Sequence, residues 1–98
     1  MTTWFISRHP GAIAWAKNQP LAVDRWVGHL DPELIEDGDV VIGTLPVHLA
    51  EAVCRRGAAF YFLIVPRQAD QRGQELELVD MLAAGCSLQR FRVVLEDE

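Results

Sequence analysis

The chain has 98 residues, and half of them are hydrophobic, which supplies enough apolar side chain for one compact core and too little for two. We therefore expect residues 1–98 to form a single domain. Nine Lys and Arg against 14 Asp and Glu leave a formal net charge of −5 at pH 7, which argues against a protein that coats duplex nucleic acid through summed phosphate contacts. A small anionic ligand held in a local basic pocket is compatible with this charge.

Neither a membrane span nor an export signal is visible in the sequence. The apolar run at residues 58–65 is far shorter than the roughly 20 residues that a membrane helix needs. The first residues lack the basic start and small-residue cleavage site of a secretory signal, so a cytoplasmic protein without a membrane partner is expected. Cys54 and Cys86 have no CxxC spacing, and we interpret both as reduced and buried.

The first part of the chain predicts a strand, a helix and a second strand. Residues 4–6 are apolar and precede a polar turn at 7–11, and residues 12–17 predict a helix that ends before Pro20. Residues 21–27 have the composition of a strand near a sheet edge. Asp31 and Pro32 then predict the N-cap and the first residue of a short helical turn, and a turn follows at 37–39.

The second part repeats this order. Residues 40–43 are continuously apolar, as in a central strand, and the next helix is predicted to begin after Thr44 as its N-cap and to end at Gly57. Residues 58–65 predict an interior strand, 76–83 a third helix and 88–95 a half-exposed last strand. The polar stretch 66–73 is longer than a usual connection and is a candidate lid.

Strands that alternate with helices predict an α/β fold: a mostly parallel sheet of about five strands with helices on both faces. In such sheets ligands bind beyond the carboxyl ends of the strands, where the strand order reverses. A flavodoxin-like order places the first and third strands on either side of that point. The loops at 7–11 and 43–46 are therefore expected to meet there.

Both loops carry groups that suit an anion. Ser7, Arg8 and His9 place a hydroxyl, a permanent cation and an imidazole between a buried strand and a helix N-terminus, where free backbone N–H groups favour negative charge. Gly43 and Thr44 offer close backbone approach and a second hydroxyl. The alternative is that these are ordinary capping and turn residues. The phosphate-loop pattern GxxxxGK and the dinucleotide pattern GxGxxG are both absent, which argues against a nucleoside triphosphatase or a nicotinamide enzyme.

The remaining histidines and the tryptophans do not change this interpretation. His48 follows Thr44 by four residues and is predicted to reach the crevice, whereas His29 follows the second strand. Without HxH, HExxH or a cysteine partner at ligand spacing, no metal site is expected. The three tryptophans sit among apolar neighbours, so packing is favoured over base stacking: Trp4, Trp15 and Trp26.

The sequence resembles a known family over nearly its whole length. The resemblance rests on Ser-Arg-His-Pro-Gly at 7–11 and Gly-Thr-Leu-Pro at 43–46, in this order and spacing, and on the blocks at 1–6, 23–27, 29–31 and 38–40. With these, the chain is similar to the small CRISPR-associated proteins of the Csx class numbered sixteen, the VVA-type family.

The resemblance implies a Rossmann-like fold related to the CARF domains that sense cyclic oligoadenylates, and a ring nuclease of type III CRISPR systems. Such an enzyme cleaves cyclic tetra-adenylate without metal or cofactor, because the ribose 2′-hydroxyl attacks the adjacent phosphate. The products are linear di-adenylates with a 2′,3′-cyclic phosphate. A sensor or sponge that binds the ring without cutting it uses the same anion sites, so the sequence does not distinguish it from the enzyme. A third alternative, an accessory domain whose loops are ordinary helix caps, is also left open.

The expected roles follow the matching blocks. Arg8 and the helix N-termini stabilise phosphate charge, Ser7 and Thr44 donate hydrogen bonds, and His9 transfers a proton, although which histidine moves it is open. Because the ring is large and symmetric, we expect a homodimer that shares it. Further ligand-binding residues are expected on the same loops, on the second helix and on the candidate lid: Pro10, Gly11, Gly43, Leu45, His48, Arg67 and Arg72.

Overall fold

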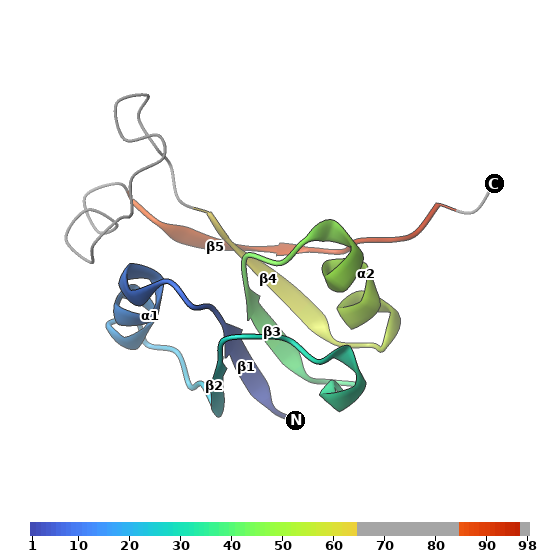
Figure 1. Ribbon diagram of the computed structural model, residues 1–98, viewed down its shortest axis with the longest axis horizontal. Coiled ribbons are helices and arrows are strands. Elements are labelled where there is room, and N and C mark those ends of the chain that lie inside the picture. Colours follow the sequence, from blue (N-terminus) through green and yellow to red (C-terminus); the bar gives the residue numbers. More distant parts are fainter. Residues whose placement is uncertain (65–84, 97–98) are drawn as a thin grey trace.

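The computed structural model describes residues 1–64 and 85–96, which build a sheet in the order β2-β1-β3-β4-β5 (Figure 1). The strands are β1 (Thr3–Ile6), β2 (Arg25–Val27), β3 (Val40–Gly43), β4 (Ala59–Ile64) and β5 (Ser87–Phe91). The first four pair in parallel, and β5 is antiparallel to β4 at the edge. The predicted mostly parallel α/β sheet is confirmed, and so is the flavodoxin-like position of the first and third strands.

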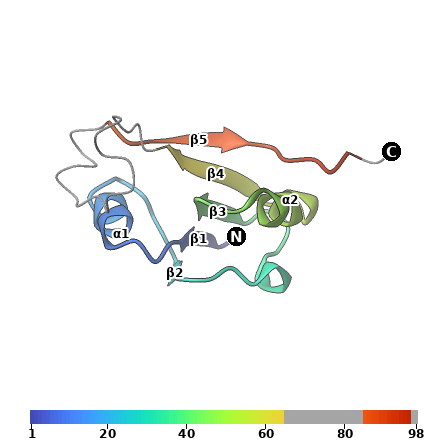
Figure 2. The same ribbon diagram turned by 45° about the horizontal axis from the view of Figure 1, so that its top comes forward.

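Two helices cover opposite faces of this sheet (Figures 1 and 2). Helix α1 (Pro10–Lys17) connects β1 to β2, and α2 (Val47–Arg55) connects β3 to β4. The connection after β1 leads to β2 on one side, and the connection after β3 leads to β4 on the other side. Because such crossovers are right-handed, the two opposite directions place the two helices on opposite faces of the sheet. A 3₁₀-helix, η1 (Pro32–Leu34), begins at the Asp31 cap that the sequence predicts.

The alternation of side chains along the strands divides the core in two. Phe5 faces α1 and packs with Trp15, whereas Trp4 and Ile6 face α2 and pack with Val53. Phe5 and Val53 are almost fully buried, and burial of each such side chain contributes about 1.5–3 kcal/mol. The continuous apolar runs of β1 and β3 are thus explained, because both faces of these strands are covered.

The helix starts differ from the sequence expectation. Helix α1 begins at Pro10, two residues earlier than predicted, because proline is accepted at the first helical position, where its missing N–H is not needed. Thr44 does not cap α2: Pro46 occupies the N-cap position, no side chain caps this end, and Thr44 is exposed.

Both edge strands are shorter than expected. β2 covers only residues 25–27 of the predicted 21–27, since the Leu21 N–H still bonds the Gln19 carbonyl in the turn after α1. β5 ends at Phe91 rather than at residue 95. The predicted lid at 66–73 and the predicted third helix at 76–83 lie outside the described residues.

Burial corrects the expectation for the cysteines and supports the one for the tryptophans. Cys54 and Cys86 are free, as expected, but half-buried; the Cys54 sulfur lies 3.4 Å from the Val93 backbone nitrogen. All three tryptophans pack against apolar neighbours, as predicted: Trp4 and Trp15 are buried, and Trp26, 38% exposed on the edge strand, packs on Phe5. Within residues 1–64 and 85–96, no helix has the length and apolar character needed to cross a membrane.

Candidate functional site

A crevice of about 340 Å³ lies at the carboxyl ends of β1, β2 and β3. It is lined by Ile6 at the end of β1 and residues 7–9 after it, residues 28–30 after β2, residues 44–46 after β3, and Leu49 of α2. This is the position at which α/β sheets bind ligands, because the two connections leave β1 and β3 in opposite directions and open a gap between them. The two loops singled out in the sequence do meet here.

The loop after β1 is held by hydrogen bonds of its backbone and of Ser7. The Ser7 N–H donates to the Val27 carbonyl at 3.0 Å and so ties this loop to the end of β2. The Ser7 Oγ accepts a hydrogen bond from the His9 N–H at 3.0 Å. The hydroxyl hydrogen of Ser7 is therefore free to rotate toward another acceptor.

His9 is the N-cap of α1. Its Nδ1 accepts a hydrogen bond from the Ala12 N–H at 3.1 Å, which satisfies one of the donors that a helix start leaves open. Its Nε2 is buried and has no hydrogen-bond partner in the part of the chain that the structure describes. A buried imidazole N–H without an acceptor is costly, and so this atom is a candidate contact for a ligand oxygen.

Arg8 is exposed and its stem crosses the loop after β2. A Cβ atom added to Gly28 would lie 2.8 Å from the Arg8 Cγ, so the glycine leaves the room through which this side chain passes. Within residues 1–64 and 85–96, no carboxylate forms an ion pair with Arg8. Its guanidinium is thus available to an anion in the crevice.

The loop after β3 approaches β1 through Gly43. A Cβ atom there would lie 2.5 Å from the Ile6 carbonyl oxygen, a backbone atom, so only glycine allows this approach. Thr44 and Leu45 follow and line the crevice, with the Thr44 side chain exposed. Thr44 is therefore placed to meet a ligand although it does not cap the helix.

Several predicted ligand-binding residues lie outside the crevice lining. Pro10 and Gly11 form the first turn of α1, and Gly43 is buried at the end of β3. His48 is exposed on α2 and is not part of the lining. Arg67 and Arg72 lie outside the described residues.

The sequence interpretation missed the third wall of the crevice, formed by Gly28, His29 and Leu30. These residues directly follow the strand that pairs with β1. In the expected strand order the loop after the second strand is the neighbour of the loop after the first, and that signal would have found them.

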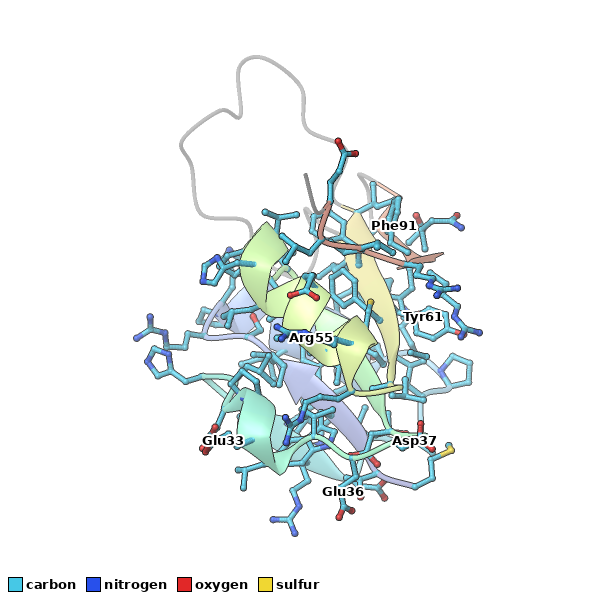
Figure 3. The ribbon with its side chains drawn as sticks, turned by 90° about the vertical axis from the view of Figure 1, so that its right-hand side faces the viewer. Glu33, Glu36, Asp37, Arg55, Tyr61 and Phe91 are labelled. Atoms are coloured by element: carbon cyan, nitrogen blue, oxygen red, sulfur yellow. The ribbon has the colours of Figure 1, made fainter. Side chains whose placement is uncertain are left out.

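Three acidic residues, Glu36, Asp37 and Asp39, lie at the opposite edge of the sheet. Glu36 and Asp37 come just before β3, so they lie at its amino end, away from the crevice (Figure 3). Asp39 is buried there and accepts hydrogen bonds from Thr2, Trp4 and Glu36. Burial raises the pKa of Asp39, but the hydrogen bonds from Glu36, Thr2 and Trp4 outweigh it and hold the pKa below the ordinary 3.8.

The described part of the chain contains no group of three or more His, Cys, Asp or Glu side chains arranged to hold a metal ion.

A mostly parallel sheet with a hydroxyl, a guanidinium and imidazoles at its switch point defines a small Rossmann-like α/β domain with a crevice suited to an anion. Residues 4–94 match the family model described as "Putative CRISPR-associated protein (Cas_VVA1548)", and the chain belongs to this family. The CRISPR association that the resemblance implied is thereby confirmed. Searches among curated proteins and among solved structures found no match.

Proposed function

We propose that this protein is a ring nuclease of type III CRISPR systems that cleaves cyclic tetra-adenylate and so ends the antiviral signal. The observation that carries the proposal is the crevice at the switch point, which brings Ser7, Arg8 and His9 together with Thr44. Membership of a CRISPR-associated family supports a nucleotide signal as the ligand. The net charge of −5 does not oppose this, since Glu36 and Asp37 lie at the other edge of the sheet.

The reaction needs alignment and charge stabilisation more than an external nucleophile. Each adenosine carries a ribose 2′-hydroxyl next to the phosphate it attacks, and the protein holds the two in line. Arg8 stabilises the charge that develops on the phosphate oxygens. Ser7 and Thr44 donate hydrogen bonds to phosphate or ribose, and a histidine of the crevice takes the 2′-hydroxyl proton.

The product assay is the direct test. Purified protein is incubated with cyclic tetra-adenylate in EDTA, and the products are resolved by chromatography. We expect linear di-adenylates that end in a 2′,3′-cyclic phosphate. An intact ring together with a raised melting temperature would instead identify a sponge or sensor, because a ligand that binds only the native state stabilises it. An intact ring with an unchanged melting temperature would favour an accessory domain that does not bind the ring.

Arg8→Ala sharpens the test. Loss of one charged donor to a developing oxyanion typically lowers the rate by about 10²- to 10³-fold, and we expect a loss of this size with an unchanged melting temperature. Arg55→Ala is the matched control, since Arg55 is exposed at the other end of α2 (Figure 3), where it pairs with Glu51. Equal rates for the two variants would remove Arg8 from the site.

A further inference from the structure

The cap of α1 determines which nitrogen of His9 carries its hydrogen. The Ala12 N–H donates to Nδ1 at 3.1 Å, so Nδ1 holds a lone pair. A neutral imidazole has one N–H and one lone pair, and the hydrogen of His9 must then be on Nε2. His9 is fixed in this form by the helix it caps.

A proton-accepting role does not fit this geometry. The Nδ1 lone pair is already used, and protonation of Nδ1 would break the cap and leave the Ala12 N–H without its acceptor. The buried Nε2–H, in contrast, has no acceptor within residues 1–64 and 85–96. His9 is therefore suited to donate a hydrogen bond to an anionic oxygen and unsuited to remove a proton.

His29 has the opposite properties. It is exposed, lines the same crevice, and its ring forms no hydrogen bond within the described part of the chain. Its place beside the loop after β1 is well determined, because Ser7 bonds Val27 and the Arg8 stem lies over Gly28. An imidazole with a free lone pair thus lies next to the phosphate-binding groups.

From this arrangement we infer that His29 is the catalytic base and that His9 is a hydrogen-bond donor to the phosphate. The inference rests on the proposed ring nuclease function. The 2′-oxygen forms a bond to phosphorus while its hydrogen passes to the free nitrogen of His29. The bond between phosphorus and the 5′-oxygen breaks, and that oxygen takes a proton from solvent. When the ring binds and displaces the atoms that cover Nε2, the His9 Nε2–H donates to a non-bridging oxygen of the same phosphate.

Two variants separate the roles of the histidines. His29→Ala is expected to cleave cyclic tetra-adenylate about 10²- to 10⁴-fold more slowly, with added imidazole restoring part of the rate. In His9→Asn the amide oxygen still accepts the Ala12 N–H, so α1 stays capped. This variant is expected to bind the ring more weakly and to gain nothing from imidazole. Melting temperatures of both variants check that the fold is kept.

The ring nitrogens of His9 provide a readout that does not depend on cleavage. In ¹⁵N-labelled protein, the ring nitrogen shifts of His9 are expected to place the hydrogen on Nε2, and a hydrogen on Nδ1 would overturn the donor assignment. Full activity of His29→Ala, or imidazole rescue of His9→Asn, in a protein whose wild type cleaves the ring would overturn the base assignment alone. An intact ring with the wild-type protein would overturn the proposed function and the base assignment with it.

Discussion

At the scale of single residues, the crevice depends on side chains that serve the fold and the ligand together. His9 caps a helix with one ring nitrogen and leaves the other without a partner, and Ser7 accepts a backbone hydrogen bond while its own hydrogen is free. The sequence identified Ser7, Arg8 and His9 as an anion-binding group. It did not reveal that the imidazole is the cap, because Ser7 and His9, two positions apart in the same turn, both offer acceptors to a helix start.

Asp39 is expected to control acid stability. Its folded-state pKa lies below the ordinary 3.8, so the stability it contributes is complete above that value and is lost as pH falls through the lower folded-state pKa. Asp39→Asn removes this charge and weakens the hydrogen bonds from Thr2, Trp4 and Glu36, at a cost of about 1–3 kcal/mol at pH 7. Urea unfolding between pH 7 and pH 3 measures both effects. The same acid dependence in the variant as in the wild type would contradict this prediction.

At the scale of elements, the walls of the crevice are three loops whose relative positions depend on strand pairing. β1 pairs with β2 on one side and with β3 on the other, in parallel, so the three carboxyl ends meet at one edge of the sheet. The strands themselves were predictable from short apolar runs. The contribution of residues 28–30 was not inferred, although the expected strand order makes the loop after β2 the neighbour of the loop after β1. Only the structure shows that these residues line the crevice.

Gly43→Ala tests how closely β3 and β1 approach at this edge. The added Cβ would lie 2.5 Å from the Ile6 carbonyl oxygen, and we expect the free energy of unfolding to fall by about 1–3 kcal/mol through overpacking. Gly38→Ala is the control, since Gly38 also has a positive φ but no atom within 4 Å of the added Cβ. Urea unfolding of both variants is the measurement, and an equal or smaller loss for Gly43→Ala would show that the backbone contact does not matter.

At the scale of the whole molecule, the crevice is small for the proposed ligand. Its volume of about 340 Å³ is near the lower end of the roughly 300–1,000 Å³ found for pockets of drug-sized ligands, and a ring of four nucleotides exceeds it. A symmetric ring suits two equivalent sites related by a two-fold axis. We therefore expect two copies of the chain to share one ring.

Sedimentation with and without cyclic tetra-adenylate measures this expectation, and a monomer under both conditions would contradict it. A mixing experiment gives a sharper result. When wild type and Arg8→Ala are co-refolded in equal amounts, mixed dimers hold one working site each. They are expected to cut the ring once and to accumulate linear tetra-adenylate, whereas independent monomers would give the same products as the wild type alone, at half the rate.

The sequence by itself determined the α/β class, the two helix-flanked strands and the two loops that carry Ser7, Arg8, His9 and Thr44. It did so because hydrophobic periodicity and turn residues act over a few neighbours along the chain. Only the tertiary structure decided that Pro46 rather than Thr44 starts α2, that Asp39 is buried, and that His29 joins the crevice. Each of these depends on which strands pair and how closely they approach, and those contacts join residues that are far apart in sequence.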